Sequence, residues 1–244
     1  MNRKLLLLSN STNAGEEYLA WPRMYIQDFC RQSGVKKILF IPFAGVNLSA
    51  DGVEKSWDIY EKRVQTIFHS LDLELYSVHH EKKPLSVVHR AEAIAVGGGN
   101  TFHLVKLLHE TGMMKTIRDR VLSGIPYMGW SAGANAACPT LRTTNDMPVS
   151  QPPSFSCLNL IPFQINPHFL DVNPAGHAGE TREQRILEFL TLNRDIYVAG
   201  LREGCLLKLT NGKLELFGRH AMRLFRYGTI PRDLLPGEDL GFLL

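Results

Sequence analysis

"IPYMGWSAGAN", residues 125–135, joins a short apolar run to a cluster of small residues. Its centre, GWSAG, fits the G-x-S-x-G elbow, in which a strand ends at a serine on a strained turn and a helix begins at once behind it. The small residues on both sides allow the turn to close and leave the hydroxyl exposed. This stretch predicts a strand, a tight turn and a helix, with Ser131 as either a nucleophile or a small residue of the turn.

The chain before this elbow alternates short apolar runs with longer amphipathic ones, which indicates β-α-β units and a mostly parallel sheet. Several short runs are apolar without interruption, as is typical of strands that helices cover on both faces. The predicted strands are KLLLLS (4–9), KKILFIPFA (36–44), LELYSV (73–78), AIAVGGG (93–99) and IPYMGWS (125–131). Helical periodicity is found at about 16–33, 54–71 and 100–123.

The character of the chain changes after the elbow. Six of the thirteen prolines lie in residues 138–170, which predicts ordered loops with short strands. Thr181 and Gln184 have the spacing of a capping box, so a helix is expected at about 181–192.

The C-terminal part predicts further strands. One is expected at 197–201, and Asn211-Gly212 between two alternating segments predicts a β-hairpin over 205–218. The chain contains no repeat and no linker. The expected fold is therefore a doubly wound, mostly parallel α/β sheet with a C-terminal β-hairpin, in a single domain over 1–244.

Composition and charge exclude several classes of protein. The formal net charge is +3, and no run of Lys and Arg is long enough to predict a nucleic-acid or membrane surface. Every apolar run is shorter than the roughly 18 residues of a membrane-spanning helix, and the start of the chain does not resemble a signal peptide. The four cysteines are scattered without a metal-binding motif, which indicates reduced thiols in a cytoplasmic protein.

A serine nucleophile requires a base within hydrogen-bond reach and an acid that orients the base. His168 in QINPHF is the candidate base among nine histidines, because it follows an apolar run and a proline at a strand end, where the sites of parallel sheets gather. Two carboxylates are candidates for the acid. Glu203 follows the strand expected at 197–201 and Asp146 lies in the proline-rich loop, but each also fits an ordinary turn residue.

Backbone amides are the expected donors for an oxyanion. The amide of Ala132 lies at the start of the helix behind the serine, where unpaired N–H groups favour negative charge. The glycines of GGGN, residues 97–100, allow the main chain to approach a ligand closely. A phosphate cradle is the rival interpretation, but GGGNTF does not complete G-x-G-x-x-G, and the chain has no G-x-x-x-x-G-K-[ST].

The order of the catalytic groups along the chain depends on which acid is chosen. α/β-Hydrolases run serine, acid, histidine, which is the order that Asp146 gives. With Glu203 the order is serine, histidine, acid, as in the class I glutamine amidotransferases, which carry a cysteine at the elbow. Spacing alone leaves both assignments open.

Longer motifs add a family resemblance. They are LLLLSNST, FIPFAGV, VGGGNTF, GWSAGAN, CPTLRTTNDMP, QINPHF and GETREQR. Together, from residue 5 to about 204, they closely resemble the peptidase E family of α-aspartyl dipeptidases. The resemblance implies a cytosolic serine peptidase with a sheet like that of the class I glutamine amidotransferases. Such an enzyme cleaves dipeptides that have an N-terminal aspartate, and it needs no metal and no cofactor.

The resemblance also implies residue roles. Ser131 matches the nucleophile, His168 the base, and Glu203 the acid of a Ser-His-Glu triad. Asp146 matches an aspartate also proposed as the relay acid, so we favour Glu203 and keep Asp146 as an active-site residue. The family's oxyanion-hole amides match Gly99 and Ala132.

The aspartyl specificity requires a cation in the pocket, and a guanidinium binds a carboxylate in bidentate fashion. Arg182 in GETREQR matches the family's proposed aspartate-reading arginine, with Arg142 and Arg185 as fallbacks. Asn100 is a second candidate for substrate binding. Arg202 departs from the family, in which a proline is expected, and a cation there could pair with Glu203 or change the charge of the pocket.

The expected partner is a small dipeptide, with neither nucleic acid nor membrane, and the sequence does not indicate an oligomeric state. Three rival functions stay open. They are a cyanophycinase-like peptidase of the same fold acting on β-aspartyl links, a non-catalytic ligand-binding homologue, and a carboxylesterase.

Overall fold

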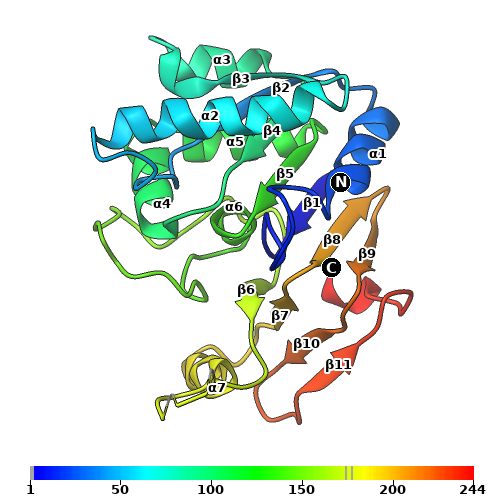
Figure 1. Ribbon diagram of the computed structural model, residues 1–244. Helices are drawn as coiled ribbons and strands as arrows, with labels where there is room; N and C mark the ends of the chain where they lie inside the picture. The colour runs from blue at the N-terminus through cyan, green and yellow to red at the C-terminus, as the bar shows by residue number, and fades with distance from the viewer. Residues whose placement is uncertain (1–2, 174, 177) are drawn as a thin grey trace.

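A seven-stranded sheet forms the body of the computed structural model, which describes residues 3–173, 175–176 and 178–244 (Figure 1). Its strand order is β3-β2-β4-β5-β1-β8-β9, and the first five of these strands are parallel. The strands are β1 (Leu5–Leu8), β2 (Lys37–Ile41), β3 (Glu74–Ser77), β4 (Ile94–Val96), β5 (Tyr127–Trp130), β8 (Cys205–Thr210) and β9 (Lys213–Gly218). The expected doubly wound α/β fold is confirmed.

Helices cover both faces of this sheet because its strands are apolar on both sides. Side chains alternate along β1, so Leu5 and Leu7 pack in one cluster with α3, α4 and α5, while Leu6 and Leu8 pack in another with α1 and α2. The helices are α1 (Arg23–Ser33), α2 (Val53–His69), α3 (Pro84–Arg90), α4 (Thr101–Glu110), α5 (Met113–Leu122), α6 (Ala132–Ala136) and α7 (Arg182–Leu192), with 3₁₀ turns η1 (Val78–His80) and η2 (Gly241–Leu243).

The helix boundaries differ from the sequence expectation in three places. The pattern at 16–33 becomes a helix only after Pro22, and residues 14–22 form turns. The pattern at 100–123 divides into α4 and α5, because Gly112 adopts a left-handed conformation between them. Helix α3 is absent from the expectation, since its seven residues show too little periodicity to be recognised.

The end of the chain contains the expected hairpin and an unexpected second sheet. Strands β8 and β9 pair across Asn211-Gly212, where both residues have positive φ. The second sheet has the order β11-β10-β7-β6 and is seen below the large sheet in Figure 1. Its strands are β6 (Gln164–Phe169), β7 (Val198–Arg202), β10 (Met222–Phe225) and β11 (Arg232–Leu234). Buried residues of both sheets share one core cluster, and the single domain over 1–244 stays a prediction.

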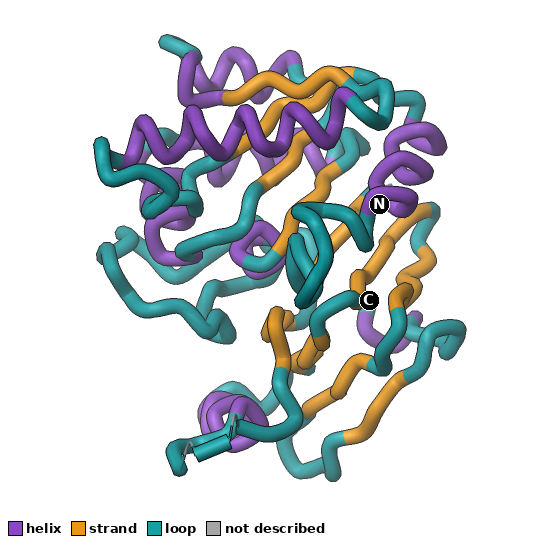
Figure 2. The backbone as a smooth tube through the Cα atoms, viewed as in Figure 1, coloured by secondary structure: helices purple, strands orange, loops and turns teal. Residues whose placement is uncertain are grey.

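The segment between α6 and β6 is drawn almost entirely as loop in Figure 2, as its prolines predict. Helix α7 begins with the expected capping box, in which Gln184 N–H donates to Thr181 Oγ1 and Thr181 N–H donates to Gln184 Oε1. Among the described residues, no helix combines the length and the apolarity that crossing a bilayer requires.

Candidate active site

The elbow has the geometry that its small residues permit. Strand β5 ends at Trp130, and Ser131 follows with φ 54° and ψ −111° as the residue that precedes α6. A positive φ at a non-glycine residue stores strain and is found at functional sites. A Cβ on Gly129 would lie 2.4 Å from the Gly133 carbonyl oxygen, and one on Gly133 would lie 2.2 Å from the Val96 oxygen. The turn therefore closes only with glycine at both positions.

His168 reaches the serine from a distortion in β6. The register of β6 against β7 shifts between Pro167 and Phe169, and His168 has φ 52°. Its backbone N–H donates to Ser9 Oγ at 2.9 Å, and Ser9 Oγ donates to the Leu201 carbonyl at 2.6 Å. Ser9 thus joins the end of β1 to β6 and β7.

Ser131, His168 and Glu203 form one hydrogen-bonded row. His168 Nε2 lies 2.9 Å from Ser131 Oγ, and His168 Nδ1 lies 2.7 Å from Glu203 Oε1. The turn that carries Glu203 is held by Asn10, whose Oδ1 accepts a hydrogen bond from the Gly204 N–H at 2.9 Å. A general base requires this contact with the proton that it removes, and it requires an oriented ring.

Asp146 lies elsewhere. Its Oδ2 accepts hydrogen bonds from the Thr101 N–H at 2.7 Å, from Thr101 Oγ1 at 2.5 Å and from Thr144 Oγ1 at 3.0 Å. The carboxylate is therefore bound at the N-terminus of α4, where its negative charge interacts favourably with the helix dipole. The structure brings Glu203, and not Asp146, to the imidazole.

The peptide between Gly98 and Gly99 is held by Tyr60. The Tyr60 hydroxyl donates to the Gly98 carbonyl at 3.0 Å and accepts from Trp130 Nε1 at 2.9 Å. A trans peptide places the carbonyl and the following N–H on opposite sides, so the Gly99 N–H points away from Tyr60. A Cβ on Gly98 would lie 3.0 Å from Ser131 Cβ, so this peptide runs directly past the serine.

The amides of Gly99 and Ala132 have no hydrogen-bond partner within the described residues. Gly99 has φ 131°, and a Cβ there would lie 2.1 Å from the Ala44 oxygen, so no other residue type fits. Ala132 is the first residue of α6. Both N–H groups are thus available to a ligand beside Ser131.

A cavity of about 480 Å³ lies over Ser131 and His168. This volume falls within the range of small-molecule sites. Among its described lining residues, Arg63 is the side chain with a permanent positive charge, and its guanidinium carbon lies 5.6 Å from the centre of the Tyr18 ring. Asn100 also lines the cavity, but its Oδ1 accepts from the His103 N–H and its Nδ2 donates to a backbone carbonyl, so its side chain caps α4.

Arg182 is not among the lining residues of this cavity. Its pKa is lowered first by partial burial and then by the charge of Arg185, while Asp146 opposes this effect. The guanidinium is therefore within electrostatic reach of Asp146. The two fallback arginines have other partners, since Arg142 donates to Asn193 and Arg185 lies 3.7 Å from Glu180.

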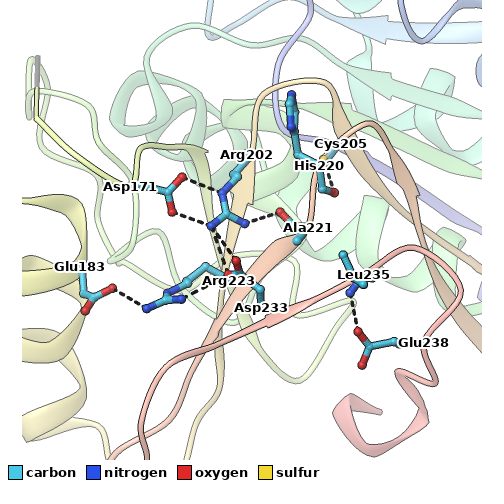
Figure 3. A network of polar contacts seen from close by, with 10 residues as sticks. All are labelled: Asp171, Glu183, Arg202, Cys205, His220, Ala221, Arg223, Asp233, Leu235 and Glu238. Atoms are coloured by element: carbon cyan, nitrogen blue, oxygen red, sulfur yellow. Dashed lines mark hydrogen bonds and ion pairs between the residues drawn. The ribbon is translucent and has the colours of Figure 1, made fainter.

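Arg202 does not pair with Glu203. Its guanidinium donates to Asp171 at 2.5 and 2.8 Å, to Asp233 at 3.1 Å and to the Ala221 carbonyl at 2.6 Å (Figure 3). The side chain is 15% exposed and links β7 to the end of β6 and to β11. The expected effect of Arg202 on the acid or the pocket charge is therefore absent from the structure, and the guanidinium instead fixes the strands that carry the row.

This network continues to α7. Arg223 lies 3.4 Å from Asp233 and 3.4 Å from Glu183, the neighbour of Arg182 (Figure 3). The first turn of α7 is thus tied to the second sheet. The hydrogen bond from Arg202 lowers the pKa of Asp171.

Replacing Arg202 with alanine is expected to lower the free energy of unfolding by about 1–2 kcal/mol at pH 7, because charged hydrogen bonds are lost from partly exposed carboxylates. A carboxylate with a depressed pKa stabilises the fold above its unfolded pKa, and this contribution disappears as the pH falls through the folded pKa. The difference from wild type should therefore shrink below about pH 4. Urea unfolding at several pH values measures it, with exposed Arg219→Ala as the control; equal losses in both variants would contradict the role of the network.

Four positions of the site are missing from the sequence expectations: Ser9, Asn10, Tyr60 and Arg63. A signal for the first two was present, because polar residues follow directly after a buried parallel strand, at its carboxyl end. Tyr60 and Arg63 gave no such signal, since an aromatic residue and an arginine are ordinary in an amphipathic helix.

Comparisons with known proteins place the whole chain beside peptidases. Residues 5–217 match the family described as Peptidase family S51. A protein of Nostoc sp. named Peptidase E is 48% identical over 244 residues, covering 100% of this chain and 98% of that protein. Peptidase E of Streptomyces coelicolor is 45% identical, covering 98% of this chain and 94% of that protein. The crystal structure of a peptidase from an acI-B1 actinobacterium shares the fold, with a TM-score of 0.72 at 19% identity over 98% of this chain and 97% of that chain.

Proposed function

The chain belongs to peptidase family S51, and on this premise we propose that it is a serine dipeptidase which hydrolyses dipeptides with an N-terminal aspartate. The family resemblance of the sequence motifs is confirmed by these matches, and so is the class of enzyme, a peptidase among the hydrolases. The observation that carries the finer proposal is the row from Ser131 Oγ through His168 to Glu203, at 2.9 and 2.7 Å. The four cysteines are free and buried, which supports a reducing cytoplasmic location.

The proposed reaction begins when Ser131 Oγ attacks the carbonyl carbon of the aspartyl residue and His168 Nε2 takes its proton. The oxyanion accepts hydrogen bonds from the amides of Gly99 and Ala132. His168 then gives the proton to the leaving nitrogen, the C–N bond breaks, and an aspartyl ester stays on the serine. Water, deprotonated by His168, attacks the ester, and free aspartate leaves as Ser131 regains its proton. Glu203 holds the imidazole in the required tautomer throughout.

An aspartyl dipeptide carries two carboxylates, one on the aspartate side chain and one at its C-terminus. We assign the side-chain carboxylate to Arg182, as the family resemblance implies. Arg63 is a candidate for the C-terminal carboxylate, because it lines the cavity over the serine. Asn100 stays a wall residue of the proposed substrate site, since its side chain, its N–H and its carbonyl all have hydrogen-bond partners within the protein.

Specificity is tested by turnover of Asp-Leu, Asn-Leu, β-linked Asp-Leu and Asp-Leu amide. Arg182→Ala is expected to lower the preference for Asp-Leu over Asn-Leu by about 100-fold, because a charged bidentate contact is lost. Arg63→Ala is expected to remove the preference for Asp-Leu over its amide. The exposed neighbour variant Lys62→Ala is the control.

Two outcomes would redirect the proposal. Aspartyl selectivity that survives in Arg182→Ala contradicts the assignment of that arginine. Faster turnover of the β-linked peptide than of Asp-Leu by the wild type would favour the cyanophycinase-like alternative.

A further inference from the structure

A cluster of two histidines and two carboxylates lies outside the catalytic row, between α2 and the turn after β3. Asp58 and Glu61 are one helical turn apart on α2, and His79 and His80 are consecutive in η1. The His79 side chain is 5% exposed and that of Glu61 is 11% exposed, whereas Asp58 and His80 reach solvent. A metal ion could therefore enter from the surface and contact buried ligands.

The distances suit a small divalent cation. Asp58 Oδ1 lies 3.2 Å from His79 Nε2 and 4.0 Å from His80 Nε2, and these three ligand atoms all lie within 4.8 Å of one another. Glu61 Oε2 lies 2.7 Å from His80 Nε2. Ligand atoms about 2.0–2.1 Å from a tetrahedral Zn²⁺ are separated by about 3.3 Å, so Asp58, His79 and His80 already lie near this spacing. Glu61 lies outside this group and must turn toward the ion to become the fourth ligand.

The contacts of His79 depend on its tautomer. Its Nδ1 lies 2.6 Å from Ser77 Oγ, and its Nε2 lies 3.2 Å from Asp58 Oδ1. In the tautomer with the hydrogen on Nδ1, this group donates to Ser77 Oγ and the lone pair of Nε2 is directed at Asp58 Oδ1. A metal ion placed between these two atoms takes this lone pair, and Ser77 is then the outer group that sets the tautomer.

Each carboxylate has one oxygen held and the other directed at an imidazole. Lys55 Nζ lies 3.3 Å from Asp58 Oδ2, and Gln65 Nε2 donates to Glu61 Oε1 at 3.1 Å. The oxygens Oδ1 of Asp58 and Oε2 of Glu61 therefore face the histidines. Orientation of the ligands by outer hydrogen bonds is a regular feature of metal sites in proteins.

We propose that Asp58, Glu61, His79 and His80 bind one divalent transition-metal ion of the Zn²⁺ type. Imidazole and carboxylate ligands suit Zn²⁺, Ni²⁺ and Cu²⁺ better than Ca²⁺ or Mg²⁺. The ion would fasten α2 to the end of β3, which lie side by side in Figure 1. Tyr60, which holds the Gly98 carbonyl, stands between Asp58 and Glu61 in the same helix. The site is structural, and hydrolysis by the catalytic row does not pass through it.

The test uses the full chain, stripped of metal with a chelator and dialysed, and titrated with ZnCl₂ by calorimetry. One ion per chain is expected to bind with a dissociation constant at or below the micromolar range. A hundredfold excess over that constant should raise Tm by about 5–10 °C. Co²⁺ in place of Zn²⁺ should give the intense visible absorption of a four-coordinate ion.

Single-residue variants test where the ion binds. His80→Ala removes an exposed ligand and should weaken binding at least 100-fold, while His69→Ala, which removes an exposed histidine at the end of α2, should leave it unchanged. Binding is also measured in His168→Ala, which removes the catalytic imidazole as an alternative ligand and should still take up one ion. Absence of saturable binding below millimolar Zn²⁺, or equal affinity in wild type and His80→Ala, would overturn the proposal. Neither result bears on peptide hydrolysis, which the chelated enzyme should retain.

Discussion

Replacing Ser131 with alanine is expected to lower kcat/KM for Asp-Leu by about 10⁴- to 10⁶-fold, the range found when an acyl-transfer nucleophile is removed. The attacking oxygen is lost, and within the described part of the chain no other hydroxyl hydrogen-bonds to His168 Nε2, which is 2.9 Å from Ser131 Oγ. The variant should still fold, because the change removes one partly buried oxygen and leaves the packing of the core as it is. Tm is therefore expected to stay within about 2 °C of the wild type.

The control for this variant is Ser70→Ala, which removes an exposed hydroxyl at the end of α2 and should leave turnover unchanged. Labelling with a fluorophosphonate adds a second readout, since the wild type should be labelled at Ser131 and the variant should not. Turnover of the variant within tenfold of wild type would place the nucleophile elsewhere. A folded wild type with neither label nor turnover would favour the ligand-binding homologue, and p-nitrophenyl esters that outperform every dipeptide would favour the carboxylesterase.

The parts of the fold that the sequence predicted are those with strong local signals. Uninterrupted apolar runs such as residues 5–8 predict central strands, because only a strand covered on both faces buries every side chain. Asn211-Gly212 predicts its hairpin, because both positions require positive φ. The glycines around Ser131 predict the elbow, since their missing Cβ atoms are what the turn needs.

The second sheet was missed for a physical reason. Strands β10 and β11 have four and three residues, too few to show a periodicity, and they form by pairing: β10 pairs with β7, and β11 pairs with β10. The role of Arg202 was missed for a similar reason, because the sequence shows only a cation next to an acid. Only the folded chain shows that Asp171 and Asp233 surround its guanidinium. Long-range partners of this kind leave no trace in local spacing.

The site was predicted as a set of residues but not as an arrangement. His168 follows a proline at a strand end, which is a recognisable pattern, and its contact with Glu203 depends on the turn that Asn10 holds. Arg63 lies on a helix far from any motif, so the sequence alone could not predict that it lines the cavity. Spacing could not choose between Glu203 and Asp146, because both follow predicted elements at loop positions.

The choice between the two acids is open to a direct test with isosteric amides. Glu203→Gln is expected to lower kcat by about 10²- to 10⁴-fold, because the imidazolium that forms during attack loses its anionic partner at 2.7 Å. Asp146→Asn is expected to lower kcat less than tenfold, since that carboxylate is bound by Thr101 and Thr144 at the start of α4. The main effect of Asp146→Asn should be a lower Tm, because α4 loses a negative charge at its N-terminus.

The two variants separate a relay acid from a residue that supports the fold, because each is measured for both kcat and Tm. A relay acid changes kcat at constant Tm, whereas a capping carboxylate changes Tm with little effect on the kcat of the folded fraction. If Asp146→Asn abolishes turnover while Glu203→Gln stays near the wild type, the relay passes to Asp146 and the order along the chain becomes serine, acid, histidine. The contact of His168 Nδ1 with Glu203 Oε1 would then be a hydrogen bond that the reaction does not use.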